Sequence, residues 1–375
     1  MAAQQDTEPP ILKLPAELTE AVADNVDAAD LRALKLTCRY LNTNVQRAFT
    51  RAHFTEQSFI LASPESMQAL VDMAKDTVYS KVVRKINLFA LKVPKSPPHP
   101  HGRYGRRRAA DSQPKGDRDT RIQKREMGRL YQQTYEKQDK FWKTRRWGIA
   151  LCDALQHINA STDGIFINLV NTAAELRSAS GVLALESLLG HTDCLAELYS
   201  DHAALSTLQD AISNGGCPLV GFRFAEPRTL LAGRDWSVQH HPGLFNDLRT
   251  VDIGFRVGQN PIELVATHLG CAPHLEHIIV RTGVCWHANT QYVHVLGAVA
   301  ELPRLQEVDI IGPYPEPGHL AAFCARYGST LKRLTISGAP AARYGQAIIS
   351  REQARKVVEK AWSAAKITGI EFELS

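Results

Sequence analysis

The chain has 375 residues and a formal charge of +5, and its hydrophobic fraction of 44% is ordinary for a folded soluble protein. No apolar run reaches the ~18 residues of a membrane-spanning helix, and Met1 to Pro10 lacks the apolar core of a secretion signal. The seven cysteines are scattered and form no Cys-x-x-Cys, which argues against a disulfide framework. We therefore expect a cytoplasmic or nuclear protein without a membrane partner.

Residues 11–50 are predicted to form a compact helical module. Proline suits the first turn of a helix, where its missing N–H costs nothing. The apolar residues that follow recur every four positions, as on one face of a helix: Leu14, Leu18, Val22 and Val26. Asp27 or Asp30 is expected to cap a second helix, whose stripe is Leu31, Leu34, Cys38, Leu41 and Val45. Two such helices cannot bury all this apolar surface against each other, so a partner or the following domain must cover the rest.

These residues also carry a resemblance. The runs Leu14-Pro15-x-Glu17-Leu18, Asp30-Leu31 and Leu36-Thr37-Cys38-Arg39-x-Leu41 resemble an F-box of the form common among fungal F-box proteins. Val22 and Val26 are smaller than the residues usual in that family. The resemblance implies binding to the Skp adaptor, and through it to a cullin. The adaptor-binding residues that it implies are Leu14, Pro15, Leu18, Val22, Leu31, Leu34, Cys38 and Leu41. The alternative is an ordinary helical cap on the domain that follows.

Residues 51–91 are predicted to begin a solenoid of strands and helices. His53-Phe54 and Phe59-Ile60-Leu61 suggest a strand. Pro64 to Asp76 suggests a helix with an apolar inner face, and Val83 to Leu88 suggests a second strand.

Residues 92–120 are predicted to form a basic, disordered insert, because prolines, glycines and basic residues dominate there. From Lys92 to Arg146 there are 17 Lys or Arg and 6 Asp or Glu, a charge of +11. The rest of the chain has 27 and 33, a charge of −6. The insert could direct nuclear import, through Gly105–Arg108 or Lys143–Arg146, contact an acidic partner or nucleic acid, or be only a solvated loop. Tyr104 alone makes no base-stacking surface, so we expect no nucleic-acid partner.

Residues 121–375 are predicted to form the main part of the solenoid. A long helix is expected from about Arg121 to His157. Beyond it, the pattern apolar-x-x-apolar-x-apolar recurs in six segments: Leu219/Phe222/Phe224, Leu248/Val251/Ile253, Leu275/Ile278/Val280, Leu305/Val308/Ile310, Leu331/Leu334/Ile336 and Ile367/Ile370/Phe372. Their first residues lie 29, 27, 30, 26 and 36 positions apart. This spacing resembles leucine-rich repeats, in which each strand–turn–helix unit buries its apolar face by stacking on its neighbours.

Helices are expected in the gaps, over Pro261–Leu269, Tyr292–Leu302, Gly318–Tyr327 and Ser350–Lys366. Further strands are expected at Val83–Leu88 and Ile165–Leu169, and Gly215-Gly216 is expected to end a helix. The asparagine or cysteine that usually closes the leucine-rich motif is missing. The predicted fold class is therefore α/β: an N-terminal helical F-box followed by a leucine-rich-repeat-like solenoid with a basic insert.

The sequence offers little that suggests a catalytic or metal site. Cys271, His274, His277, Cys285 and His287 follow no familiar zinc spacing, and the repeat register points them in different directions. His240-His241 and the run from His191 to Cys194 lack an evident catalytic arrangement. There is no GxSxG, P-loop or dinucleotide motif. We expect no enzyme activity, no catalytic residues, no cofactor and no metal.

The repeat register also predicts a face for a protein target. Strand side chains alternate, so the positions between the buried apolar residues point outward. The outward positions selected as candidate target-binding residues are Arg223, Asp252, His277, Arg281, Glu307, Asp309 and Arg333, followed in the same register by Thr335, Glu371 and Glu373. Either this is a mixed-charge recognition surface or it is only the solvated side of the sheet.

Together the two resemblances imply a substrate-recognition adaptor of a Skp–cullin–F-box ubiquitin ligase. The F-box would bind the Skp adaptor and the solenoid would bind a protein target, whose identity the sequence does not reveal. The alternatives are a leucine-rich-repeat scaffold or a nucleic-acid-associated binding protein, neither with a ligase role.

Overall fold

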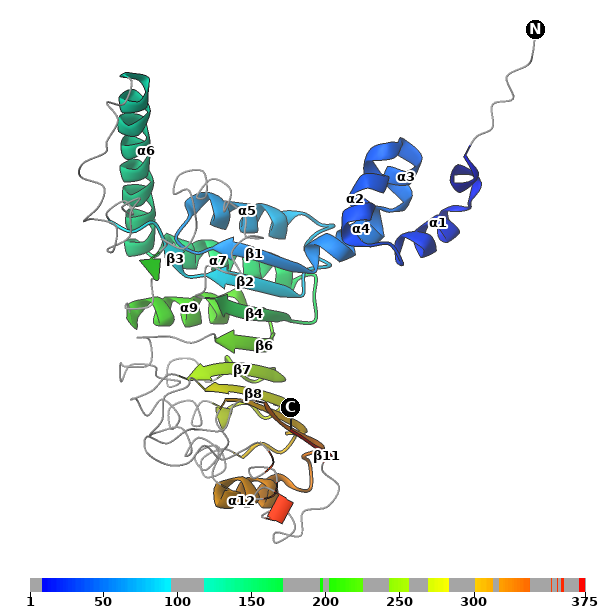
Figure 1. Cartoon of the computed structure of the whole chain (residues 1–375), viewed down its shortest axis with the longest axis vertical. Helices are drawn as coiled ribbons and strands as arrows, with labels where there is room; N and C mark the ends of the chain where they lie inside the picture. The colour runs from blue at the N-terminus through cyan, green and yellow to red at the C-terminus, as the bar shows by residue number, and fades with distance from the viewer. Residues whose placement is uncertain are drawn as a thin grey trace.

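The structure is a computed structural model that describes residues 9–95, 118–170, 196–197, 202–224, 243–255, 269–282, 301–312, 317–337, 352, 356, 359–360 and 371–374. Its main body is a parallel β-sheet, and a small group of helices leads into the first strand (Figure 1). The predicted α/β class is confirmed. No helix in the described part of the chain is both long and apolar enough to cross a membrane.

The N-terminal group of helices, here called the helical module, spans residues 10–54. A short 3-10 turn (η1, Pro10–Lys13) precedes four helices: α1 (Ala16–Ala23), α2 (Ala28–Thr37), α3 (Arg39–Asn44) and α4 (Gln46–Phe54). Their small core joins Ala23, Leu31, Val45 and Ala48. The expected single second helix is wrong, because Cys38 adopts an extended backbone (φ −158°, ψ 165°) and separates α2 from α3.

The predicted strand at His53-Phe54 is also wrong, because both residues belong to α4. Phe54 stacks on Tyr79 with 4.0 Å between ring centroids, in the segment that leads to the second strand of the sheet. This aromatic contact holds the end of the module against the sheet domain.

The described residues form a nine-stranded sheet whose strand order follows the chain. Its strands are β1 (Glu56–Ile60), β2 (Lys85–Phe89), β4 (Ile165–Val170), β6 (Leu219–Phe224), β7 (Thr250–Phe255), β8 (His277–Thr282), β9 (Glu307–Ile311), β10 (Arg333–Ser337) and β11 (Glu371–Leu374). Every neighbouring pair is parallel. Two short strands, β3 (Leu91–Lys92) and β5 (Ala196–Glu197), form a separate antiparallel pair.

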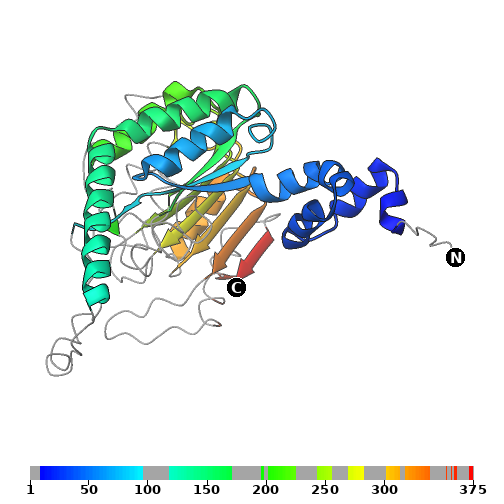
Figure 2. The same cartoon turned by 90° about the horizontal axis from the view of Figure 1, so that it is seen from above.

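Parallel neighbours need long crossover connections, and in the described part of the chain helices supply several of them. The helices α5 (Pro64–Lys75), α7 (Arg146–Asn159) and α9 (His202–Gly215) lie together on one face of the sheet (Figure 2). Farther along the chain, α12 (Pro317–Tyr327) provides the connection between β9 and β10. The predicted helices Pro64–Asp76 and Gly318–Tyr327 are thus confirmed. Those expected at Pro261–Leu269, Tyr292–Leu302 and Ser350–Lys366 fall largely outside the described residues.

The described residues of the first five apolar triplets lie in the core beneath the sheet, as predicted, and the sixth triplet lies outside the residues whose burial is described. In the second triplet Leu248, Val251 and Ile253 are 0, 2 and 6% exposed. The leucine that opens the second, third, fourth and fifth triplets precedes its strand and still lies in the core, whereas Leu219 begins β6 itself. The predicted strand at Ile165–Leu169 is confirmed, and so is the helix stop, since α9 ends at Gly215 and Gly216 adopts φ +65°.

The long helix expected over residues 121–157 is two helices. The first, α6, spans Arg118–Lys143 and ends just before Arg145, which adopts a left-handed φ of +57° and precedes α7. Trp142 and Trp147 stack across this corner with 5.0 Å between ring centroids. The chain turns here because stacking the two indoles buries both of them against the core.

The start of the predicted basic insert is ordered. Lys92 belongs to β3, and the backbone N–H of Val93 donates to Gln138 Oε1 on α6 at 2.8 Å. At its other end, Arg118 already begins α6. Residues 96–117, and with them Gly105–Arg108, lie outside the described part of the chain.

Candidate interaction surfaces

The face of the sheet opposite α5, α7 and α9 carries the predicted target-binding residues. Strand register aligns all of them except Arg281 in two rows across the sheet, and Arg281 lies two residues beyond Ile279 on β8. One row passes through Thr250, His277, Glu307, Arg333 and Glu371, and the other through Asn168, Arg223, Asp252, Ile279, Asp309, Thr335 and Glu373. We call this surface the polar face. The residues chosen from the sequence are therefore brought together.

Asp252 is the centre of the charge arrangement on the polar face. Its carboxylate accepts hydrogen bonds from Arg281 Nε at 2.8 Å and Arg281 Nη2 at 2.9 Å. On the other side, Arg223 Nε lies 3.2 Å from Asp252 Oδ2. Asp252 is only 4% exposed, so the expectation that it points into solvent is wrong. The two guanidinium groups cover it, and a target would meet the arginines rather than the aspartate.

The next charges along the sheet are also paired with one another. His277 Nε2 lies 2.8 Å from Asp309 Oδ2, and Arg333 hydrogen-bonds Glu307. Each pair joins neighbouring strands and is only partly exposed. Opposite charges therefore lie side by side on this part of the polar face, and each is paired within the chain. Reversing the charge of Glu307 would place a positive charge beside Arg333, and reversing that of Asp309 would remove the acceptor of His277, with a modest cost because both pairs are partly exposed.

The polar face continues onto the first three strands with a hydrogen-bond network of neutral side chains that ends at the carboxylate of Glu56. Asn168 Nδ2 donates to Asn87 Oδ1 at 2.7 Å, and Asn87 Nδ2 donates to Ser58 Oγ at 3.1 Å and to Glu56 Oε1 at 2.8 Å. These asparagines were not selected from the sequence. The alternation of apolar and polar residues could have identified them, since each asparagine lies between two buried apolar strand residues.

Glu56 closes this network at the edge strand β1. Burial acts to raise the pKa of its carboxyl, but hydrogen bonds from Asn87 and Lys85 and the positive charges of Lys85 and Arg223 outweigh burial. The pKa of Glu56 is consequently lowered from its ordinary value. A carboxylate held ionised here ties β1 to β2, because Lys85 Nζ lies 2.9 Å from Glu56 Oε1.

The helical module divides the predicted adaptor-binding residues into two groups. Leu31 and Leu41 are buried, at 2 and 4% exposed, so their assignment to a contact surface is wrong: they support the module from within. Leu34 and Cys38 are half-buried. Leu14 is half-buried as well, and its carbonyl accepts a hydrogen bond from the Tyr40 hydroxyl that ties the start of the module to α3.

The exposed group lies mainly on and before α1. Pro15 is exposed, and Leu18 and Val22 are 53 and 44% exposed, one helical turn apart. Leu36, at the end of α2, is 80% exposed and was absent from the predicted set, although it belongs to the F-box-like run. Large apolar side chains left in solvent on so small a module are typical of a surface that a partner covers.

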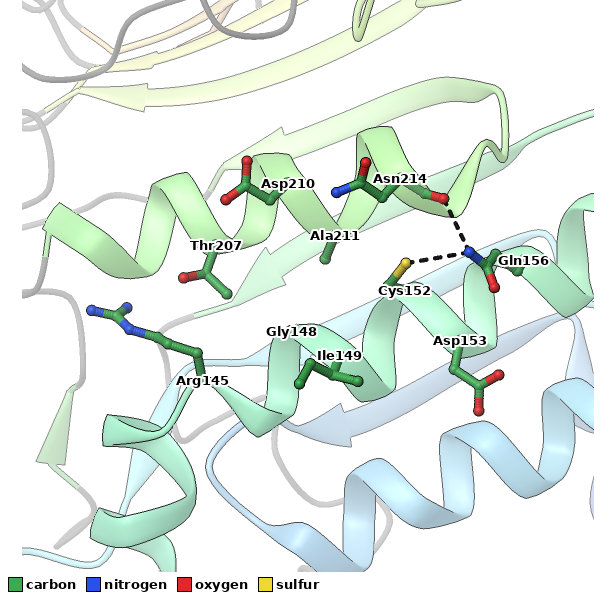
Figure 3. Close-up of a pocket in the computed structure, with 10 residues that line it drawn as sticks. All are labelled: Arg145, Gly148, Ile149, Cys152, Asp153, Gln156, Thr207, Asp210, Ala211 and Asn214. Atoms are coloured by element: carbon green, nitrogen blue, oxygen red, sulfur yellow. Dashed lines mark hydrogen bonds between the residues drawn. The ribbon is translucent and has the colours of Figure 1, made fainter.

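A groove of about 510 Å³ lies between α7 and α9 on the helical face of the molecule (Figure 3). The helices approach closely because Gly148 has no side chain, and a Cβ there would lie 2.4 Å from Thr207 Cγ2. Gln156 Nε2 bridges the helices at one end, by donating to Asn214 O at 3.2 Å and contacting Cys152 Sγ at 3.6 Å.

The groove offers no activated nucleophile. Burial, together with the charge of Asp153, raises the pKa of the Cys152 thiol, so it stays protonated near neutral pH. Asp153 is itself paired with Lys75 Nζ at 3.0 Å. The buried thiols are less reactive still, since burial raises the pKa of Cys217 to about 11 and of Cys324 to about 12.

No group of three metal-ligating side chains occurs among the residues that the structure describes. Of the histidines and cysteines weighed as ligands, Cys271 and His274 lie before β8 and His277 lies on the polar face. Cys285 and His287, like His240-His241 and the run from His191 to Cys194, fall outside the described ranges.

The fold and these surfaces define the class of molecule: an α/β protein with a parallel sheet, one polar face, and a helical module that exposes apolar side chains. No protein-family model matches the sequence, and no curated protein matches it either.

Proposed function

We propose that this chain is a non-catalytic substrate adaptor of a Skp–cullin–F-box ubiquitin ligase. In this proposal the helical module is an F-box that binds the Skp adaptor, and the sheet domain is a leucine-rich-repeat-like solenoid that binds a protein target. The protein would act by proximity, because holding the target beside the ligase raises the effective concentration of its lysines.

The observation that carries the proposal is the exposure of Leu18 and Val22 on a module whose sequence resembles an F-box. Burying such side chains against a partner is worth about 1.5–3 kcal/mol each when burial is complete. With about half of their surface in solvent they contribute little to the fold, so a partner explains them better than the module's own stability does.

The arrangement of the two parts is consistent with an adaptor. The last helix of the module, α4, runs through Thr55 directly into β1, so the module lies at the start of the strands (Figure 2). The polar face therefore stays uncovered by the module along the rest of the sheet. One end would face the ligase and the remaining length would be free for a target.

The test is binding of the purified full chain to a purified Skp adaptor, with the Leu18→Glu/Val22→Glu double variant beside it. Placing two carboxylates on this surface should weaken binding on the order of a hundredfold or more. The matched control is Ile149→Glu on α7, another exposed apolar residue (70%), which should bind as the natural chain does. Circular dichroism of each variant verifies that the fold is retained.

If the natural chain does not bind the Skp adaptor, the adaptor role is rejected and a scaffold without a ligase is the better reading. If the double variant binds undiminished, the role of α1 in the contact is rejected. The nucleic-acid alternative has less support, because the charges on the described polar face are mixed and mutually paired rather than uniformly basic.

A further inference from the structure

The middle of the polar face, over β6 to β8, exposes charge of one sign. The side chains of Arg223 and Arg281 are 25 and 39% exposed, whereas that of Asp252, on the strand between them, is 6% exposed. Two guanidinium groups share this single carboxylate, so two positive charges and one negative charge leave a net charge of +1. A molecule that approaches this part of the sheet therefore meets positive charge.

Both guanidinium groups are held in place by the chain itself. Arg281 donates to the two oxygens of Asp252 at 2.8 and 2.9 Å, and Arg223 Nε lies 3.2 Å from Asp252 Oδ2. Such contacts restrain long side chains that would otherwise sample many rotamers. An anion that binds here therefore loses less conformational entropy than one that binds an arginine free in solvent.

The acids that flank this cluster are engaged by other side chains. On β1, Glu56 lies 2.9 Å from Lys85 Nζ. On β9, Asp309 accepts a hydrogen bond from His277 Nε2 at 2.8 Å. Neither acid takes the place of Asp252 as the shared partner of the two arginines.

Two isoleucines lie beside the arginines on the same face. Ile279 on β8 and Ile311 on β9 occupy outward positions, where most residues of these strands are polar, and both are half-buried. Strand register places Ile279 opposite Asp252 and Ile311 opposite Arg281. Neither isoleucine belongs to the core on the other side of the sheet. They offer a small apolar surface next to the guanidinium groups.

The cationic and apolar parts of this surface lie close together. The register partner of Arg281 on β7 is Gly254, but its guanidinium group reaches back to Asp252, in the row that contains Ile279. A ligand that uses both parts must carry its carboxylate and its apolar group on one residue or nearly so. Neighbouring side chains of an extended peptide point to opposite sides, so an internal acidic residue followed by an apolar one does not present both. The last residue of a chain does, because its carboxylate and its side chain share one Cα.

We propose that this surface, here called the arginine–isoleucine site (Arg223, Arg281, Ile279 and Ile311), binds the C-terminal residue of a target protein when that residue is apolar. The two guanidinium groups would hold the terminal carboxylate, whose single negative charge matches the net charge of +1. The isoleucines would cover the side chain. The biological meaning of this contact rests on the proposed adaptor function, since the bound chain end would belong to the protein that is ubiquitinated.

A phosphate group is the weaker candidate for the same site. A phosphorylated side chain carries about −1.5 to −2 at neutral pH, which exceeds the net positive charge of the cluster. A nucleic acid needs a run of basic side chains, and it leaves the two isoleucines without a use. Binding of a phosphopeptide or of DNA is therefore kept as an outcome of the test.

The experiment measures fluorescence anisotropy with the full chain in the absence of any Skp adaptor. The first probe is a peptide of glycines that ends in leucine with a free carboxylate and carries its label at the N-terminus. The comparison probes are the same peptide with a C-terminal amide, the peptide with serine in place of leucine, an amidated peptide with internal glutamate and leucine, an amidated phosphoserine peptide, and a single-stranded DNA. The natural chain should bind the first probe at least about tenfold more tightly than each of the others.

The Arg223→Gln variant should lose about tenfold or more in affinity for the first probe. This change leaves the bidentate pair of Arg281 with Asp252 in place, so the sheet should stay folded. The matched control is Arg333→Gln, the same replacement on the same face, where the arginine pairs with Glu307. It should bind the first probe as the natural chain does, and circular dichroism verifies the fold of both variants.

The apolar part of the site has its own variant. Ile279→Ser should reduce the preference for a terminal leucine over a terminal serine by about fivefold or more, because the lost surface contacts only the side chain of the probe. The matched control is Ile149→Ser, an exposed isoleucine on α7 at the opposite face of the sheet. It should leave that preference unchanged.

Four results would overturn the proposal: equal losses in Arg223→Gln and Arg333→Gln, an unchanged preference in Ile279→Ser, binding of any comparison probe as tight as that of the first, or no binding of the first probe by the natural chain. The proposed ligase role fails separately. If the natural chain does not bind the Skp adaptor but the peptide results hold, the site belongs to a scaffold. If it binds the Skp adaptor but not the first probe, the adaptor role stands and the assignment of this site is wrong.

Discussion

Asp252 on β7 and Arg281 on β8 form a bidentate ion pair, in which Arg281 Nε and Nη2 each donate to a different carboxylate oxygen of Asp252. The aspartate is 4% exposed and Arg223 approaches it from β6. Two arginines on separate strands are therefore held by one buried acid. The polar face depends on this acid for its shape, because without it the two guanidinium groups would repel each other.

Asp252→Ala should lower the free energy of unfolding by about 2–4 kcal/mol. Removing the acid leaves two positive charges on neighbouring strands, although their partial exposure lets water recover part of the loss. Urea unfolding measures the change. Asp309→Ala is the comparison and should cost about 1 kcal/mol, because Asp309 and His277 are both more exposed. Equal losses in the two variants would show that Asp252 has no special place in the sheet.

Leu31→Ala should destabilise the helical module by about 2–4 kcal/mol, since Leu31 is 2% exposed in its core. Leu18→Ala should change stability by less than about 0.5 kcal/mol, because the side chain is 53% exposed. Hydrogen exchange of residues 16–54 distinguishes the two, with faster exchange expected only in the first variant. Faster exchange in both would mean that Leu18 packs within the module.

Replacing Gly221 by alanine and replacing Gly128 by alanine should change the stability of the protein in opposite directions. At Gly221 on β6 a Cβ would lie 2.0 Å from Phe166 Cδ2, so the aromatic ring must move and the protein should lose about 1–3 kcal/mol. At Gly128 on α6 the surroundings are open, and alanine should add up to about 1 kcal/mol of helix stability. The midpoints of urea unfolding measure both effects. A stabilising Gly221→Ala would contradict the strand packing described here.

Glu56 should contribute a pH-dependent part of the stability. Its pKa is lowered in the folded chain, so the unfolded chain binds the proton more readily. The stabilisation is complete above the ordinary pKa of 4.5 and is lost as the pH falls through the lower folded value. The stability difference between the natural chain and Glu56→Gln should therefore be largest near neutral pH and shrink in acid. A difference that does not vary with pH would mean that the carboxylate is no more stable in the folded chain than in the unfolded one.

The alternation of apolar and polar residues was enough to locate the strands. Val251 and Ile253 are separated by Asp252, and that period-two pattern alone predicts which side chains enter the core. The same reasoning placed Arg223, His277 and Arg333 on a common face. Asn87 and Asn168 obey the same rule and could have been found by applying it to the first strands.

Other features depended on residues distant in the chain. Asp252 and Asp309 occupy equivalent positions in their repeats, yet only Asp252 is buried, because Arg223 and Arg281 converge on it from strands before and after. Leu18 and Leu31 are both leucines on helical stripes, and only the packing of α2 against α4 decides which of them is buried.

The direction of α6 could not be predicted from the sequence either. No proline or glycine marks the corner at Arg145, and the turn arises where Trp142 and Trp147 stack on each other against the core. The sequence by itself determined which residues are apolar and with what period, and hence most of the described strands, the helices α5 and α12 and the two faces of the sheet. Only the tertiary structure decided which charged groups are buried, which leucines remain exposed, and in which direction α6 runs. These depend on free energies of contacts between segments far apart in the chain, which local periodicity does not encode.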